Sequence, residues 1–185
     1  MKRIISLFTL LLCSLSVFSQ ELEEADFVGN VRAFTPSNNI INLDKTNVQI
    51  KVKATGSKIW WGIGSSKQFI EVPGPNANTK IANNSGYKFI VKAANNSMDP
   101  SNIVMLFKLE KKGKNRRAQM GKVNNAFGNS SSGFDQINFE GKKYGESSYI
   151  IDPGMLMPGE YGIVVLNPDQ PNQTNLIVYS FSVIE

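Results

Sequence analysis

The stretch IVMLFKLEKKGKNRRAQMGKV, from Ile103 to Val123, decides the fold. It begins with a short apolar run rich in β-branched and aromatic residues, and Pro100 supplies a turn just before it. Such a run favours a strand over a helix. Lys111–Asn115 is polar and contains Gly and Asn, residues that tolerate the positive φ of a tight connection. The stretch therefore predicts a β-hairpin whose return strand begins at Arg116.

The tip of this hairpin is strongly basic. Seven lysines and arginines lie from Lys108 to Lys122 against one acid, Glu110, which gives a local charge of +6 on a chain of net charge +5. A dense cationic surface attracts polyanions such as nucleic acid, acidic polysaccharide or a phosphorylated membrane surface. Nucleic-acid binders usually add stacking aromatics, and none lies between Lys108 and Lys122. The alternative is a solvated hairpin whose lysines protect a sheet edge from pairing.

Outward from the hairpin, the chain alternates short apolar runs with turn residues. Val48–Ala54 alternates apolar and polar residues, which predicts a strand with one buried face. Glu160–Leu166 and Leu176–Ile184 are near-continuous apolar runs and predict two further strands. Weaker strands are expected at residues 27–34, 59–63, 69–72, 87–93, 137–140 and 148–151, and a long flexible loop at 124–133.

Roughly nine or ten short strands without helical periodicity predict an all-β protein. We expect an antiparallel two-sheet β-sandwich of the immunoglobulin-like kind, because each sheet then buries one face of its alternating strands. The expected division is a signal peptide at 1–20, an N-terminal extension with a weak strand at 21–46, and the β-sandwich domain at 47–185.

Residues 1–20 have the features of a secretory signal peptide. Lys2 and Arg3 precede the apolar run Ile4–Leu12, which is too short for a membrane span, and small residues follow at Ser14–Ser19. Cys13 offers the alternative of a lipoprotein, although a leucine rather than a small residue stands before it. We therefore expect export to the periplasm, the outer surface or the medium, and no second run approaches the length of a membrane span.

Loss of this segment would remove Lys2 and Arg3 from the 20 basic residues and leave 18 against 15 acidic ones. It would also remove the single cysteine. An exported domain without disulfides depends on its hydrophobic core, and a chain of this length can build one.

Several runs resemble a group of small exported proteins of Bacteroidota that have no assigned activity. They are GIGSSKQFIEVPG, SGYKFIVKAANNSMDPSNIVMLFKLEKKGKNRR, KKYGESSYII and PGEYGI, all within Asn47–Glu185. The resemblance implies export and a β-rich domain. It implies no catalytic residue.

The composition limits the possible chemistry. The chain has no histidine, and its cysteine lies in the expected signal peptide, so Ser–His–Asp and Cys–His catalysis and the usual zinc and copper sites are excluded. We predict no catalytic residue, no metal and no cofactor. One further hypothesis, ranked third, is a hydrolase that uses two carboxylates, although the spacing of the acidic residues in the sequence does not suggest a catalytic pair. Its candidate acids are Asp135, Glu140, Glu146, Asp152 and Glu160.

The leading hypothesis is an exported, non-enzymatic binding, adhesive or assembly module of unknown ligand. The alternative is recognition of a polyanion or glycan by the basic hairpin and an exposed tryptophan, since adjacent tryptophans in a strand face opposite sides. Candidate partners are an envelope protein, an acidic polysaccharide or an anionic membrane surface. The candidate ligand surface consists of Lys111, Lys112, Lys114, Arg116, Arg117, Trp60 and Trp61.

Overall fold

The computed structural model describes residues 22–55, 65–124, 129–132, 136–167 and 175–185. These residues form strands and connections without an α-helix, and their single helical turn is the 3₁₀ turn η2 (Pro100–Asn102). No helix in the described ranges has the length and apolarity to cross a membrane. The all-β prediction is therefore confirmed.

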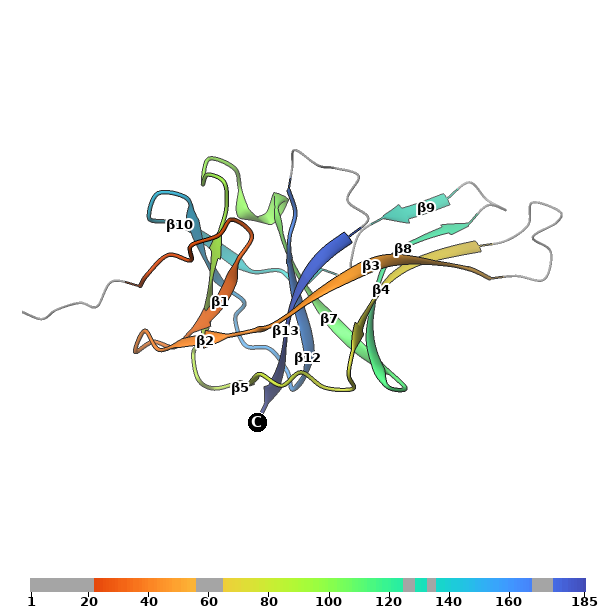
Figure 1. Ribbon diagram of the computed structural model, residues 1–185, viewed down its shortest axis with the longest axis horizontal. Helices are drawn as coiled ribbons and strands as arrows, with labels where there is room; N and C mark the ends of the chain where they lie inside the picture. The colour runs from red at the N-terminus through yellow and green to blue at the C-terminus, as the bar shows by residue number, and fades with distance from the viewer. Residues whose placement is uncertain (1–21, 56–64, 125–128, 133–135, 168–174) are drawn as a thin grey trace, which may run out of the picture.

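Five strands form a separate antiparallel sheet in the order β10-β11-β6-β1-β2. The strand β1 lies inside this sheet, between β6 and β2, so the segment assigned to an N-terminal extension contributes to it. Figure 1 shows this sheet on the left of the molecule. Its strands are β1 (Val31–Phe34), β2 (Ile40–Asn42), β6 (Lys88–Lys92), β10 (Glu140–Tyr144) and β11 (Ser148–Asp152).

Six further strands close into an antiparallel barrel in the order β12-β7-β8-β4-β3-β13, because β12 also pairs with β13. Two short strands attach to it: β5 (Lys80–Ala82) runs parallel to β13, and β9 (Asn129–Ser132) pairs with β8. The barrel strands are β3 (Asp44–Thr55), β4 (Ser65–Pro73), β7 (Val104–Lys112), β8 (Asn115–Asn124), β12 (Gly159–Val165) and β13 (Asn175–Ile184).

The arrangement differs from the predicted immunoglobulin-like sandwich of two open sheets. The physical reason is that three strands are buried on both faces. β7, β12 and β13 bury one face against the five-stranded sheet and the other face inside the barrel. Strands buried on both faces read as near-continuous apolar runs, as Leu176–Ile184 does. We call these three strands the shared wall; they lie in the centre of Figure 1.

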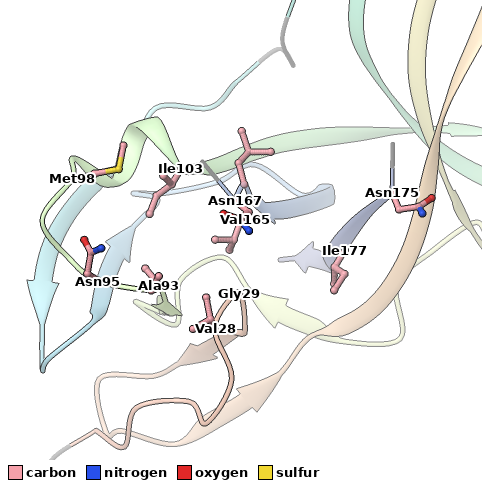
Figure 2. A pocket seen from close by; sticks show the side chains of 12 residues that line it. Val28, Gly29, Ala93, Asn95, Met98, Ile103, Val165, Asn167, Asn175 and Ile177 are labelled. Atoms are coloured by element: carbon pink, nitrogen blue, oxygen red, sulfur yellow. The ribbon is translucent and has the colours of Figure 1, made fainter. Parts of the chain in front are cut away.

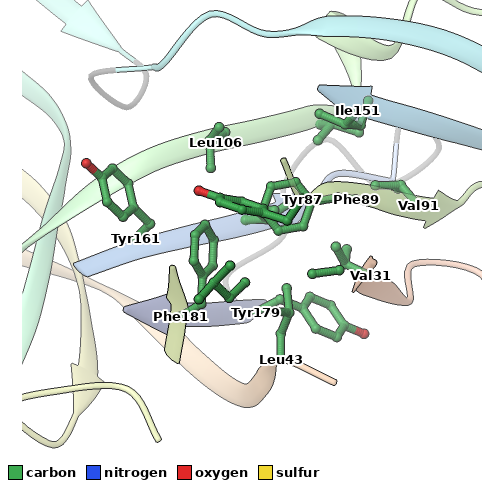
Figure 3. Packing of buried hydrophobic residues seen from close by; sticks show 14 of the residues in the cluster. Val31, Leu43, Tyr87, Phe89, Val91, Leu106, Ile151, Tyr161, Tyr179 and Phe181 are labelled. Atoms are coloured by element: carbon green, nitrogen blue, oxygen red, sulfur yellow. The ribbon is translucent and has the colours of Figure 1, made fainter. Parts of the chain in front are cut away.

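The larger core lies between the five-stranded sheet and the shared wall. Phe89 of β6 meets Phe181 of β13 with ring centroids 5.1 Å apart, and Tyr161 of β12 stacks on Phe181 at 5.6 Å (Figure 3). The second core fills the barrel. It contains Val48, Ile70, Val72, Phe107, Leu109, Ala118, Val164, Leu176 and Val178.

The predicted basic hairpin is present as β7 and β8. Lys112 pairs with Asn115, so the connection has two residues, and Gly113 adopts a φ of 63°. Positive φ at the first of two central residues is the geometry of a type II′ turn, which glycine adopts without strain. Both predicted strands of the hairpin and the turn between them are therefore confirmed.

Other elements were not predicted. The sequence predicts no strand where β2 and β5 lie, and β9 lies within the predicted 124–133 loop. Its sequence, NSSS, has no apolar residue, and its backbone pairs with β8. The strand predicted at 137–140 is wrong for 137–139, because β10 begins at Glu140. The strand expected at residues 59–63 lies outside the described residues.

Candidate functional site

The outer face of β3, β4 and β8 carries an unusual set of neighbouring cations. Lys53 of β3 pairs directly with Lys67 of β4, and Lys67 pairs directly with Lys122 of β8. Paired residues of neighbouring strands lie on the same face of a sheet. Three lysine positions therefore form a row across three strands, although they are far apart in the sequence.

Next to this row lies a groove of about 450 Å³, which we call the basic groove. Five cationic side chains and one carboxylate line it, together with Phe69, Phe107, Ala118 and Gln119. The charged residues are Lys53, Lys67, Lys108, Lys112, Arg117 and Glu110. The groove brings the base of the hairpin together with β3 and β4.

Glu71 of β4 neutralises part of this face. Its Oε2 accepts from Arg117 Nε at 2.9 Å and lies 3.7 Å from Lys51 Nζ, and its Oε1 accepts from Asn115. Partial burial acts to raise the pKa of Glu71, but the hydrogen bond from Asn115 and the charges of Arg117 and Lys51 outweigh it and lower the pKa. Glu71 is therefore held as a carboxylate, with Arg117 fixed beside it.

Arg117 also covers the aromatic ring in the groove. Its guanidinium carbon lies 5.1 Å from the centroid of the Phe69 ring, which is within the range of a cation–π contact. One face of Phe69 is therefore occupied by the protein's own cation.

Three lysines of the groove have no such partner. No carboxylate of the described residues lies within 4 Å of the Nζ of Lys53, Lys67 or Lys108. All three side chains are exposed. Lys112 lies 3.5 Å from Glu110, and both side chains are more than half exposed, so that pair contributes little.

The structure separates the predicted hairpin residues. Lys112 and Arg117 line the basic groove. Lys114 is exposed in the turn, and the ammonium of Lys111 donates to Asn76 Oδ1 in the 73–79 connection. Arg116 points into the barrel and is buried. Trp60 and Trp61 lie outside the described residues.

Arg116 belongs to a network that closes one end of the barrel. Its Nη1 donates to Glu160 Oε2 at 3.1 Å, while Nε and Nη2 donate to the carbonyls of Gly74 and Pro73 at 3.1 and 3.2 Å. Glu160 also accepts from Ala77 N at 2.8 Å and from Ser182 Oγ at 2.7 Å. Every polar group of this pair is occupied by the protein, so Arg116 serves the fold.

Of the carboxylates proposed for hydrolysis, the structure brings Glu140 and Asp152 to one pocket. Glu160 is buried against Arg116, and Glu146 is exposed in a turn. Glu140 pairs across strands with Asp152, whose oxygens accept from Lys88 at 2.8 Å and from Gly154 N at 3.0 Å. The bond from Lys88 lowers the pKa of Asp152, which is opposite to the raised pKa of a general acid. Asp135 lies outside the described residues.

Lys53, Lys67 and Phe69 were not predicted from the sequence as neighbours of the basic hairpin, which included Lys108. The alternation of Val48–Ala54 places Lys51 and Lys53 on the polar face of a strand. It does not say which residue of another strand lies opposite, and that pairing creates the lysine row. The signal available in the sequence was the number of outward-facing lysines on each predicted strand, which could have indicated a basic face of the sheet.

No protein-family model, curated protein or solved structure matches this chain.

Proposed function

We propose that the protein is an exported, non-enzymatic binding module that holds an acidic polysaccharide in the basic groove. Export is inferred from the sequence of residues 1–20. One observation carries the proposed ligand: Lys67 has a lysine directly opposite on both sides, Lys53 and Lys122.

Like charges directly opposite in a sheet destabilise it. The usual remedy is an acid opposite the cation. Further along β4, Glu71 has that role: it pairs directly with Arg117 and lies 3.7 Å from Lys51 Nζ. In the described part of the chain, no carboxylate lies within ion-pair distance of Lys53 or Lys67. An anionic ligand that bridges the ammonium groups would remove the repulsion between the lysines. The repulsion that destabilises the free protein would therefore favour binding of the ligand.

The groove favours a polysaccharide over single-stranded nucleic acid. Nucleic-acid grooves combine cations with aromatic faces on which bases stack. Of the two aromatic residues that line this groove, Phe107 is buried in the barrel core, and Arg117 already covers one face of Phe69. A polymer with regularly spaced sulfates or carboxylates needs only the lysines and does not need a stacking platform.

The test is retention on immobilised heparin, with oligo(dT) as the second column. The triple variant Lys53→Gln, Lys67→Gln, Lys108→Gln should elute from heparin at clearly lower salt than the parent. The slope of log affinity against log salt should fall by roughly 2 units, because three lysine contacts are lost and each contributes about 0.7–0.9 to the slope. The matched control removes three exposed lysines outside both the groove and the hairpin: Lys80→Gln, Lys142→Gln, Lys143→Gln.

Equal losses in the two triple variants would show a response to net charge alone and would refute a specific groove. Tighter retention on oligo(dT) than on heparin, lost with the groove lysines, would replace the polysaccharide by nucleic acid.

A further inference from the structure

A second cavity, separate from the basic groove, opens between the five-stranded sheet and the shared wall. Its volume is about 330 Å³. Val28, Ala93 and Met98 line it from the side of the five-stranded sheet, and Val165 and Ile177 line it from β12 and β13 (Figure 2). We call it the apolar cavity.

The lining of this cavity is apolar and uncharged. Among the described residues that line it there is no Lys, Arg, Asp or Glu, and the polar side chains are three carboxamides, Asn95, Asn167 and Asn175. A chain with 35 charged residues places none of them here. Small-molecule sites typically have volumes of about 300–1,000 Å³, mostly apolar walls and a few polar groups.

The cavity has a buried floor and an apolar rim. Ala93 and Ile103 at the floor are each 5 % exposed and belong to the larger core. Val28, Met98 and Ile177 at the rim are 64, 41 and 44 % exposed. Large apolar side chains gathered in the open around a hollow mark an interaction site more often than single exposed ones do.

Hydrogen bonds from both layers hold the rim in place. Asn30 Oδ1 accepts from the Tyr179 hydroxyl of β13 at 2.9 Å, and Gly29 N donates to the Lys92 carbonyl at 2.7 Å. On the opposite side, Leu166 N donates to the Ile103 carbonyl at 2.7 Å. The walls are therefore fixed relative to each other without a ligand, and a fixed site avoids part of the ordering cost of binding.

We propose that the apolar cavity binds an uncharged, largely apolar small molecule. A carboxylate or ammonium would lose its hydration there without meeting an opposite charge, which is costly. A hydroxyl or carbonyl can instead hydrogen-bond to a carboxamide of the lining. The enclosed volume suits a short aliphatic or aromatic body rather than a protein surface.

The experiment uses the full chain and the uncharged fluorescent probe N-phenyl-1-naphthylamine. The parent should give a saturable fluorescence rise. Ile177→Glu should weaken the probe's affinity by roughly tenfold or more, because it puts a charge at the rim. The control is Ile184→Glu, on the same strand and outside the cavity, since Ile184 is 43 % exposed and Ile177 is 44 %. Ile184→Glu should bind the probe like the parent.

A second pair of variants keeps the test decisive if a change in β13 prevents folding. Met98→Glu lies at the rim and should weaken binding, whereas Met155→Glu, also at an exposed methionine, should not. Competition then tests the ligand class: 1-decanol should displace the probe at lower concentration than decanoate or decylammonium does.

Three outcomes would overturn the proposal. They are the absence of saturable probe binding, equal effects of the rim and control variants, and preferential displacement by either ion. A parent that sediments as a dimer, with Ile177→Glu sedimenting as a monomer, would also overturn it, because the cavity would then be a contact between two copies.

Discussion

Arg116 and Glu160 form a buried ion pair inside one end of the barrel, with Nη1 and Oε2 3.1 Å apart and side chains only 3 and 6 % exposed. The partners come from β8 and β12, 44 residues apart in the chain. The pair also ties the 73–79 connection to the barrel, because Gly74, Pro73 and Ala77 all bond to it. The end of the barrel is thus closed by polar groups that satisfy one another.

Removing either partner of this ion pair should lower the stability of the protein strongly. Arg116→Met or Glu160→Leu leaves a buried charge without its partner, and we expect each to lower the free energy of unfolding by about 3–5 kcal/mol. The double variant should cost clearly less than the sum of the two. Urea unfolding measures all three. The control is the exposed pair Glu110–Lys112, where Glu110→Leu and Lys112→Met should each change stability by less than about 1 kcal/mol. Equal costs at the two pairs would contradict this account.

Gly162 lies where the barrel core leaves no room for a methyl group. A Cβ there would approach Phe107 Cε2 to 2.8 Å and Val178 Cγ1 to 3.1 Å. Phe107 is fully buried and cannot move aside, so Gly162→Ala should destabilise by about 1–3 kcal/mol. Gly159→Ala on the same strand is the control, since its closest neighbour would be the flexible Lys108 side chain at 3.4 Å. Thermal unfolding should separate the two variants, and a Gly162→Ala protein as stable as Gly159→Ala would show that the core can relax.

Two carboxylates that pair with lysines of β6 should make the stability of the protein depend on pH in the acid range. The hydrogen bond from Lys92 lowers the pKa of Glu24 below its ordinary value of 4.5, and that from Lys88 lowers the pKa of Asp152 below 3.8. A depressed folded-state pKa contributes stability that is fully present above the ordinary value. It is lost as the pH falls from that value through the lowered folded-state pKa.

Glu24→Gln and Asp152→Asn should therefore reduce the loss of stability between about pH 5 and pH 3, measured by urea unfolding at several pH values. Lys88→Met removes the partner of Asp152 and should reduce it similarly to Asp152→Asn. An unchanged pH dependence in Lys88→Met would mean that Lys88 is not the cause of the shift.

Glu71 should limit the affinity of the basic groove for polyanions. Its carboxylate engages Arg117 and Lys51, so Glu71→Gln adds one positive charge and frees both cations for a ligand. We expect elution from heparin at higher salt together with a lower stability of the free protein. Glu140→Gln, on β10 and outside the groove, changes the net charge equally and should have a much smaller effect. The prediction fails if Glu71→Gln elutes with or before the parent.

Local features were predictable from the sequence, and pairings between distant strands were not. The turn at Gly113 and the two flanking strands follow from residues within one short stretch. The period of two in a strand also implies that Arg116 and Arg117 point to opposite faces. No local pattern predicts that Arg116 pairs with Glu160 inside the barrel. Nor does one predict that Arg117 pairs with Glu71 on the outer face.

The barrel was missed for the same reason. A strand with both faces apolar fits a sandwich, a barrel or a shared element equally well. Closure depends on β13 pairing with both β12 and β3, and the sequence of Leu176–Ile184 contains no sign of a second partner. The basic groove depends likewise on the register of Lys53 against Lys67.

The position of β13 has a consequence for how the chain matures. This strand follows all the other described strands, yet it closes the barrel and supplies side chains to both hydrophobic cores. Neither core can be completed while residues 175–184 are still in the ribosome or in a translocation channel. Both hydrophobic cores of this chain therefore receive their last side chains together, when β13 pairs with β12 and β3.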